Sequence, residues 1–397
     1  MRCEALQVDF SQPPWALAAP VVAGLTAAGH VVVFVGGCVR DHLLGRPITD
    51  LDLATDASPD QVEALFERCV TVGKQFGVTV VLVPGGEVEV ATFRSDEAYI
   101  DGRRPTGVVT ATEEVDVERR DFTCNALVLD PVRKQLRDHV GGLADIEAKC
   151  LRVVGDPKAR LEEDRLRVLR GLRFAAHLGF TIEPATEQAL RSVATTGLSR
   201  ERIWEEWRKG VSDPCRSRWV CLVNELGLGS VLSPLLATAD LPSLDHLPAD
   251  CPSLSALAAT LAATEPEALA AWLKTEPISR EWRRDLPWLV CHQHPATWDS
   301  SLAERRAKLL APAAASLMPL LVNREDWPQA ANLHAEFTHL SAHRPQPYLT
   351  GADLIALGVA PGPQLGEILA ALWKAQLAGE ISDFSTAKEH AVALAGL

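Results

Sequence analysis

Short apolar runs and helical patterns alternate along the first third of the chain. Val31–Val35 is an uninterrupted apolar run rich in β-branched residues, which predicts a strand buried on both faces. Val78–Val83 and Val88–Phe93 predict two further strands on either side of a Pro-Gly-Gly turn. Leu127–Leu129 and Leu136–Val140 predict short strands that close the same sheet. The pattern therefore predicts an α/β unit with a mixed sheet of about four or five strands.

Beyond Gly179 the pattern becomes helical only. Glu183–Thr195 and Ser199–Val211 have helical periodicity, and the later sequence is rich in Ala and Leu. Residues 1–20 are expected to be a poorly fixed lead-in. The predicted fold class is an α/β head followed by an all-α neck, body and tail. We expect the boundaries to be 1–145 for the head, 146–211 for the neck, 212–342 for the body and 343–397 for the tail.

Composition narrows the class of protein further. Of 397 residues, 47% are apolar and 23% charged, and no apolar run approaches the length of about 18 that a membrane span needs. Nine cysteines without a Cys-x-x-Cys pair favour reduced thiols and a cytoplasmic location. The net charge of −13 counts mildly against a nucleic-acid partner. Two groups of basic residues nevertheless predict salt-sensitive RNA binding: Arg160, Arg165, Arg167, Arg170 and Arg173, then Arg200, Arg202, Arg208, Lys209, Arg216 and Arg218.

Glycines and carboxylates follow the first predicted strand. Gly36 and Gly37 allow a tight turn to which a ligand can come close. Cys38–Leu44 predicts a short helix whose N-terminus faces that turn and favours an anion such as phosphate. Acidic and apolar residues then alternate, so Asp50 and Asp52 are expected on one face of a strand, about 6–7 Å apart. Such a pair suits Mg²⁺ and, beside a phosphate-binding turn, nucleotidyl transfer.

Two stretches carry a family resemblance. GGCVRDHLLGRPITDLDLAT, at residues 36–55, resembles the signature GG-x-VRD-x-x-LG-x-x-x-x-D-x-D of class II tRNA nucleotidyltransferases and bacterial poly(A) polymerases, within the polymerase β superfamily. ERRDFTCNAL, at residues 118–127, resembles the same family's RRDFT-x-NAL. The resemblance implies transfer of nucleotides from CTP and ATP to a tRNA 3′ end, with Mg²⁺ held by Asp50 and Asp52.

The resemblance also implies roles for neighbouring residues. Gly36, Gly37 and Arg40 would cradle the triphosphate, and Arg120 would contact it with a permanently charged guanidinium. Asn125 would position neighbouring groups, together with Asp121.

Two further features of the head are open to more than one interpretation. Glu89 could supply a third catalytic carboxylate if it shares the face of Asp50 and Asp52; otherwise it is an edge-strand residue facing water. The polar segment Ser95–Glu118 is long and has little periodicity. In the resembled family a flexible loop at this place helps to switch nucleotide choice from C to A, and relatives that add only C lack it.

A third motif lies in the predicted neck. Asp164, Arg167, Arg170 and Arg173 recur at helical spacing, beside an apolar seam of leucines. A solvated charged face has the same pattern. The stretch also resembles the family's ED-x-x-R-x-x-R motif, which reads the incoming base.

The chemistry of the bases fits that resemblance. Cytosine and adenine each present an amino donor beside a ring acceptor, which complements an Asp164 carboxylate beside an Arg167 guanidinium. Guanine and uracil present the reverse order and would leave buried groups unpaired. Arg170 and Arg173 would face phosphates or the RNA end, or would be structural.

The leading hypothesis is template-independent addition of CCA to tRNA with release of pyrophosphate. An A-adding enzyme or a poly(A) polymerase would share every motif above. A catalytically inactive RNA-binding relative is the alternative from another class, and intact Asp50 and Asp52 argue against it.

Overall fold

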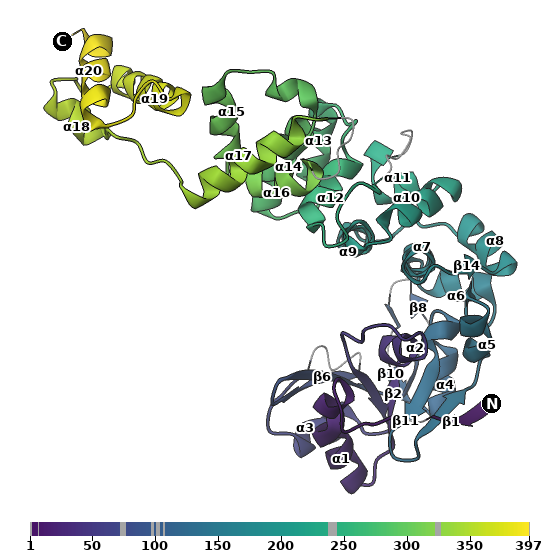
Figure 1. Cartoon of the computed structure of the whole chain (residues 1–397). Helices are drawn as coiled ribbons and strands as arrows, with labels where there is room; N and C mark the ends of the chain where they lie inside the picture. Colours follow the sequence, from purple (N-terminus) through teal and green to yellow (C-terminus); the bar gives the residue numbers. More distant parts are fainter. Residues whose placement is uncertain are drawn as a thin grey trace. The chain divides into compact units, whose positions relative to one another are not determined.

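The computed structural model describes residues 2–6, 8–71, 77–96, 99–100, 104–105, 108–236, 244–321 and 327–396. Contacts divide the chain into two units. The first comprises Met1–Glu206 and Cys221–Val231, and the second comprises Trp207–Val220 and Leu232–Leu397. Figure 1 shows the sheet in the N-terminal part and helices in the C-terminal part. The finer division into head, neck, body and tail stays a prediction.

The described part of the first unit contains an eight-stranded mixed sheet, so the expected four or five strands were too few. The strand order is β1 (Arg2–Ala5), β12 (Gln135–Asp138), β11 (Leu127–Asp130), β2 (Val32–Val35), β3 (Asp52–Thr55), β6 (Gly86–Thr92), β5 (Val78–Val83) and β4 (Cys69–Thr71). Neighbouring strands are antiparallel except β3 and β6, which are parallel. A parallel pair needs a crossover connection, and here α3, β4 and β5 supply it.

The expectation of a poorly fixed N-terminal segment was wrong. Strand β1 pairs with β12, with Arg2 opposite Asp138. Trp15 begins the short 3₁₀ helix Trp15–Ala18, is 4% exposed, and meets the Phe34 ring edge-on at 4.7 Å. These residues lack the simple periodicity of a long helix or strand, but their aromatic rings are needed to cover β2.

The sheet has two differently covered faces because side chains alternate along each strand. On one face, Val35, Ala54 and Val128 pack in a buried cluster with Val117. Val117 belongs to α4 (Glu113–Glu118). The other face includes Phe34 and its aromatic neighbours. Asp52 begins β3 and alternation places it on the face of Ala54, so it lies on the side of the sheet that α4 covers.

The remaining elements of the first unit frame this sheet. Its longer helices are α1 (Ala19–Ala27), α2 (Gly37–Leu43), α3 (Pro59–Leu65), α5 (Gly142–Glu147), α6 (Pro157–Glu163), α7 (Leu166–Leu178), α8 (Pro184–Ser192) and the start of α9 (Arg200–Ser212). Among the described residues, three minor strand pairings join β7 (Arg94–Asp96) with β10 (Val108–Thr110), β8 (Tyr99–Ile100) with β9 (Arg104–Pro105), and β13 (Cys150–Leu151) with β14 (Thr181–Ile182), and an isolated bridge joins Phe122 and Val153.

The described parts of the segment Ser95–Glu118, expected to be a loop, contain regular secondary structure. Its start pairs with Val108–Thr110, and its end is α4. Asp101 and Arg103, two charged residues of this segment, lie outside the described residues.

The second unit is helical throughout its described residues. Its elements are α10 (Arg216–Glu225), α11 (Gly229–Leu232), α12 (Ser253–Thr260), α13 (Pro266–Thr275), α14 (Arg280–His292), α15 (Leu302–Leu309), α16 (Ala314–Leu321), α17 (Ala330–Ala342), α18 (Gly351–Ala356), α19 (Pro363–Ala378) and α20 (Phe384–Ala395), although α10 and α11 also contribute to the first unit. The last three pack around a buried cluster that includes Leu354, Ile368 and Leu372. Within the described ranges, no helix has both the length and the apolar character to cross a membrane.

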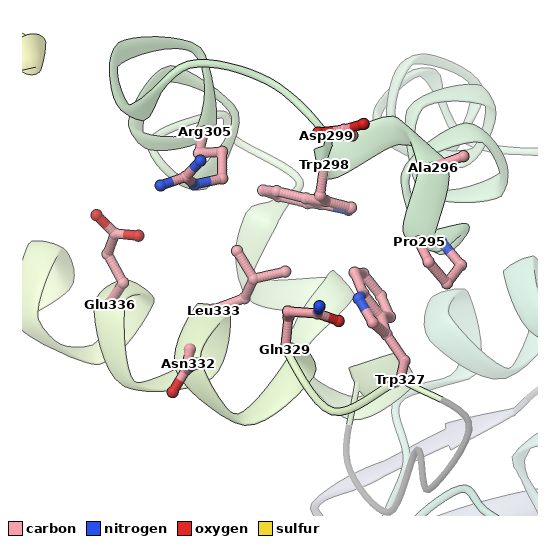
Figure 2. A pocket seen from close by; sticks show the side chains of 10 residues that line it. All are labelled: Pro295, Ala296, Trp298, Asp299, Arg305, Trp327, Gln329, Asn332, Leu333 and Glu336. Carbon is pink, nitrogen blue, oxygen red and sulfur yellow. The ribbon is translucent and has the colours of Figure 1, made fainter.

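A pocket of about 570 Å³ lies in the second unit, between α17 and the segment before α15. Figure 2 shows Trp298 on one wall, opposite Trp327 and Leu333, with Arg305 and Glu336 toward one end. None of these residues belongs to a motif that the sequence singled out. The chemistry predicted from sequence therefore has to be found in the first unit.

Candidate nucleotidyltransferase site

Two carboxylates from distant parts of the sequence are brought side by side in the sheet. Asp52 is the first residue of β3, and its register partner on the parallel strand β6 is Glu89. Directly paired residues on neighbouring strands project from the same face. The structure therefore places Glu89 on the same face of the sheet as Asp52. A shared face was required for Glu89 to supply a third carboxylate. Whether Glu89 acts in catalysis stays a prediction.

The surroundings of Asp52 shift its pKa. Burial of Asp52, followed by the negative charge of Glu89, raises the pKa of Asp52 to about 6, although Arg120 partly offsets this. Asp50 adds a smaller repulsion. Such crowding of negative charge is typical of a site that binds a cation.

The oxygen donors present fit a hard divalent cation such as Mg²⁺. Within the described residues, no three His, Cys, Asp or Glu side chains form a complete metal site. A partial set of carboxylates is what Mg²⁺ requires, because it completes its coordination with water and substrate phosphates. Asp52 and its strand partner Glu89 form such a partial set, and the predicted role of Asp50 and Asp52 as metal ligands stays untested.

Asp50 is not placed as the sequence predicted. The alternation of acidic and apolar residues placed Asp50 and Asp52 on one face of a strand, but β3 begins only at Asp52. Asp50 lies in the preceding extended segment, is exposed, and accepts a hydrogen bond from its neighbour Thr49 (3.1 Å). Since no strand pairing fixes Asp50, its carboxylate depends on local conformation for its position.

A glycine and an arginine converge on Asp52. Gly36 precedes α2 with a φ of 75°, a conformation that favours glycine. A Cβ atom there would lie 3.1 Å from Oδ2 of Asp52 and 3.7 Å from Nη1 of Arg120. The missing side chain therefore leaves room between the α2 turn, the carboxylate and the guanidinium. Gly37 follows as the first residue of α2.

Arg40 lies on α2 but binds protein groups rather than the carboxylates of the sheet. It is 5% exposed, and it donates to both oxygens of Asp41 (2.9 and 2.8 Å) and to Oδ1 of Asn125 (2.5 Å). The Asn125 amide in turn donates to Asp121 (3.2 Å). Arg40 is thus held next to the RRDFT stretch, and its predicted triphosphate contact remains untested.

The network continues into α7 through Asp121. Arg170 donates to Oδ2 of Asp121 through Nε (3.0 Å) and Nη2 (2.6 Å). Burial of Asp121 favours its neutral form, but the charge and hydrogen bonds of Arg170, with those from Asn125 and the Phe122 backbone, hold its pKa at about 2. Arg170 of α7 is therefore paired with Asp121, and this contact joins α7 to the head.

Arg173 is also paired within the first unit. Its Nε donates to Glu206 of α9 at 2.7 Å, and Arg170 approaches the same carboxylate at 4.0 Å. The guanidinium carbons of Arg40, Arg170 and Arg173 lie 5.4, 5.3 and 4.4 Å from the centre of the Phe174 ring. Several guanidinium groups around one ring are stabilised by its negative π-face. These contacts favour the structural interpretation of Arg170 and Arg173.

Asp164 and Arg167 do not form one continuous helical stripe. Helix α6 ends at Glu163 and α7 begins at Leu166, so Asp164 lies in the break between them. Arg202 of α9 donates to both oxygens of Asp164 (3.0 and 2.7 Å), which also accepts a hydrogen bond from the Leu166 backbone (3.1 Å). The stripe predicted from spacing was therefore wrong at its first member.

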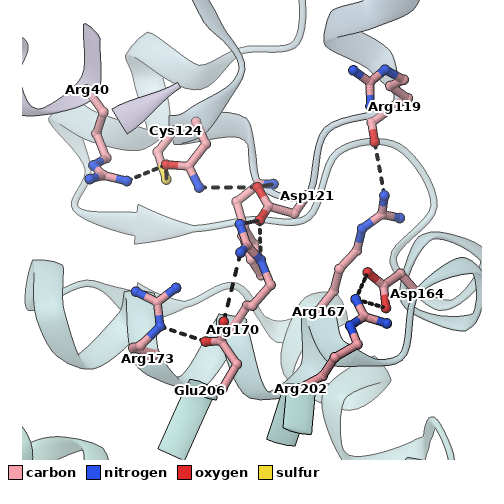
Figure 3. Close-up of polar contacts among 12 residues, drawn as sticks. Arg40, Arg119, Asp121, Cys124, Asp164, Arg167, Arg170, Arg173, Arg202 and Glu206 are labelled. Carbon is pink, nitrogen blue, oxygen red and sulfur yellow. Dashed lines mark hydrogen bonds and ion pairs between the residues drawn. The ribbon is translucent and has the colours of Figure 1, made fainter. Parts of the chain in front are cut away.

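Arg167 lies on the next helix and has other partners. It donates to the carbonyl oxygens of Arg160 (2.7 Å) and Arg119 (3.1 Å) and to Glu163 (2.9 Å). Figure 3 shows the Asp164 carboxylate at Arg202 and the Arg167 guanidinium at Arg119. Neither group uses its whole hydrogen-bonding capacity in these contacts. A base could therefore still be read by both, as the sequence predicted.

Several residues of the site were missed at the level of sequence. Asp116 pairs with both Arg119 and Arg120 at helical spacing, and this i, i+3 and i, i+4 pattern could have revealed it. Arg202 and Glu206 reach the motifs only through tertiary packing of α9, for which the sequence carries no local signal.

Comparisons with known proteins agree with this geometry. Residues 32–152 match the family described as "Poly A polymerase head domain", and residues 179–240 match "Probable RNA and SrmB- binding site of polymerase A". The chain is 35% identical over 398 residues to a CCA-adding enzyme of Streptococcus pyogenes serotype M2, covering 93% of this chain and 94% of that protein. A CCA-adding enzyme of Streptococcus mutans is 35% identical over 410 residues, 96% of each chain.

A solved structure extends the likeness to the fold. The Bacillus stearothermophilus CCA-adding enzyme in complex with CTP matches with a TM-score of 0.80 and 29% identity, over 95% of this chain and 98% of that one. The predicted fold class and family resemblance are confirmed. Because the identity extends over nearly the full length of both curated relatives, this chain belongs to the family of CCA-adding nucleotidyltransferases.

Proposed function

We propose that this protein adds CCA to the 3′ end of tRNA without a nucleic-acid template, using CTP and ATP and releasing pyrophosphate. One observation carries the proposal: the 35% identity to CCA-adding enzymes extends over nearly the whole chain. The matched part includes the head, in which Gly36, Asp52 and Arg120 converge. The nine free thiols further favour a cytoplasmic location.

The residues of the head have distinct tasks in this proposal. Asp52 and Glu89, with Asp50 beside them, provide the carboxylate oxygens for divalent metal. Bound Mg²⁺ would lower the pKa of the RNA 3′-hydroxyl and neutralise charge on the triphosphate. Arg120 donates to phosphate oxygens next to the space left by Gly36. Holding both reactants in one orientation accounts for much of the catalysis that such a site can provide.

The residues after the head select the base. Asp164 accepts a hydrogen bond from the amino group of cytosine or adenine, and Arg167 donates to the adjacent ring nitrogen. Arg202 holds the Asp164 carboxylate in place in the absence of a nucleotide. Uracil and guanine would set a carbonyl against a carboxylate and an N–H against a guanidinium, and both are rejected for that reason.

Single-nucleotide incorporation tests the function. The protein is incubated with Mg²⁺, one nucleoside triphosphate at a time, and tRNA that lacks CCA, ends in CC or is complete. We expect two additions from CTP on the first substrate, one from ATP on the second, and none on complete tRNA. Addition of A to tRNA ending in CC, without any C addition to tRNA lacking CCA, would identify an A-adding enzyme. Continued addition of A would identify a poly(A) polymerase. Binding of tRNA without any incorporation would identify an inactive relative.

Replacing Asp164 with alanine tests base selection. The preference for CTP over UTP is expected to fall by roughly 10- to 100-fold, since a carboxylate no longer opposes the uracil carbonyl. The measurement is kcat/KM for each nucleotide on tRNA lacking CCA. Glu162→Ala removes an exposed carboxylate nearby and is expected to leave the preference unchanged. A uniform loss of rate with unchanged preference would show Asp164 to be structural.

A further inference from the structure

A buried carboxylate on α4 holds two consecutive arginines. Asp116 is 2% exposed, and its Oδ1 accepts hydrogen bonds from Nε (3.0 Å) and Nη2 (2.6 Å) of Arg119. Its Oδ2 accepts from Nη2 of Arg120 at 3.0 Å. The backbone N–H of Arg94, in β7, also donates to Oδ1 (3.3 Å). One side chain therefore joins the end of α4 to the stem of the segment between β7 and β10.

The pairing leaves one end of Arg120 directed at the carboxylate site. Nη2 is held by Asp116, whereas Nη1 lies beside Gly36 and the Arg120 charge acts on Asp52. Nε of Arg120 is buried and has no hydrogen-bond partner among the described residues. Fixing a long arginine side chain costs conformational entropy. The contact with Asp116 fixes the Arg120 side chain before a nucleotide binds. The phosphate contact is therefore preorganised.

The same turn is tied to the base-reading arginine. The last carbonyl groups of a helix have no partners within it. Here the Arg119 carbonyl accepts from Arg167 (3.1 Å), and the Glu118 carbonyl accepts from Arg160 (2.7 Å). The end of α4 therefore sets Arg120 and Arg167 relative to each other. A substitution at Asp116 would therefore affect both the triphosphate and the base of a bound nucleotide through Arg120 and Arg167.

We propose that Asp116 is a positioning residue for the incoming nucleotide, which holds Arg120 toward Asp52 and so lowers the cost of binding the triphosphate. The inference rests on the proposed function, since it takes a nucleoside triphosphate as the ligand of Arg120. Asp116 stays ionised at neutral pH: burial raises its pKa, but Arg120 and Arg119 outweigh this and give a net lowering. Its negative charge is therefore available to both arginines throughout the working range of pH.

Asp116→Asn tests the proposal, with Asp130→Asn as the matched control. Asp130 is 4% exposed in the same unit and also pairs with two arginines, Arg133 (3.4 Å) and Arg137 (3.2 Å), away from Asp52. We expect Asp116→Asn to raise KM for CTP and ATP alike by roughly tenfold and to change kcat much less. Asp116→Glu keeps the charge and is expected to restore much of the loss. Asp130→Asn is expected to lower Tm but to keep the wild-type KM.

A double variant separates positioning from general destabilisation. If Asp116 acts through Arg120, adding Asp116→Asn to Arg120→Lys is expected to raise KM by less than about twofold more. Fully independent effects, an equal rise of KM in Asp130→Asn, or an unchanged KM in folded Asp116→Asn would overturn the proposal. If Asp116→Asn does not fold, Asp116→Glu takes its place in the cycle, and a rise of its KM that adds fully to that of Arg120→Lys would overturn the proposal too. A wild-type protein without incorporation would instead refute the proposed function itself.

Discussion

Asp52→Asn is expected to reduce nucleotide incorporation by about 10³-fold or more, because an amide cannot replace the charge of a carboxylate toward a divalent cation. Asp52 lies at the meeting point of Gly36, Glu89 and Arg120, so its loss removes the centre of the site. The measurement is single-turnover transfer of one nucleotide from CTP to tRNA lacking CCA. Turnover within tenfold of the wild type would refute the assignment of Asp52.

The loss of activity is expected to come without a loss of stability. Burial and the charge of Glu89 raise the pKa of Asp52, so the ionised carboxylate costs folding free energy at neutral pH. Without divalent cations, the asparagine variant is therefore expected to be at least as stable as the wild type at pH 7, by thermal unfolding. Glu87→Gln serves as the activity control. It removes an exposed carboxylate on β6, the strand that also carries Glu89.

The largest effect on stability is expected from Asp121→Asn, at about 2–3 kcal/mol of unfolding free energy. The substitution leaves the Arg170 guanidinium without its closest carboxylate and weakens the link to Asn125. Urea unfolding at pH 7 measures the loss. Replacing Arg170 with Gln as well is expected to give less destabilisation than the sum of the single variants, because the charge left unpaired is then removed.

The destabilisation is also expected to depend on pH. The pKa of Asp121 is lowered to about 2 in the folded protein, from a usual value of 3.8. The stability that the carboxylate contributes is thus fully present above about pH 5 and is lost as the pH falls toward 2. The difference between wild type and Asp121→Asn should therefore narrow between pH 5 and pH 3. A difference that stays constant over this range would show that the charge of Asp121 is not the cause.

Local sequence was sufficient for the elements that carry strong periodicity. The Val31–Val35 run became β2, the segment beginning at Gly37 became α2, and both strands around the Pro84 turn are present. Strands β1 and β4 were missed because each is short and lacks an alternating pattern. Pairing stabilises them instead: β1 pairs with the distant strand β12, and β4 pairs with the next strand, β5. The width of the sheet was therefore underestimated.

The site shows the same division between local and tertiary information. Spacing alone suggested that Asp50 is the acidic neighbour of Asp52. The neighbour that strand pairing fixes is instead Glu89, because the parallel pairing of β3 and β6 places it opposite Asp52. A helical stripe from Asp164 to Arg173 was a reasonable extrapolation of period, yet the chain breaks between α6 and α7. Asp164 then pairs with Arg202, a contact that only tertiary packing can determine.

The pairing of β1 with β12 has a consequence for synthesis of the protein on the ribosome. Strand β1 precedes its partner β12 along the chain, so the sheet cannot be completed until the roughly 130 residues between Ala5 and Gln135 have been translated. At ordinary translation speeds this takes on the order of ten seconds, during which Arg2–Ala5 has no strand to join. A nascent chain that stalls before β12 would expose an open sheet edge, and such edges recruit chaperones or aggregate.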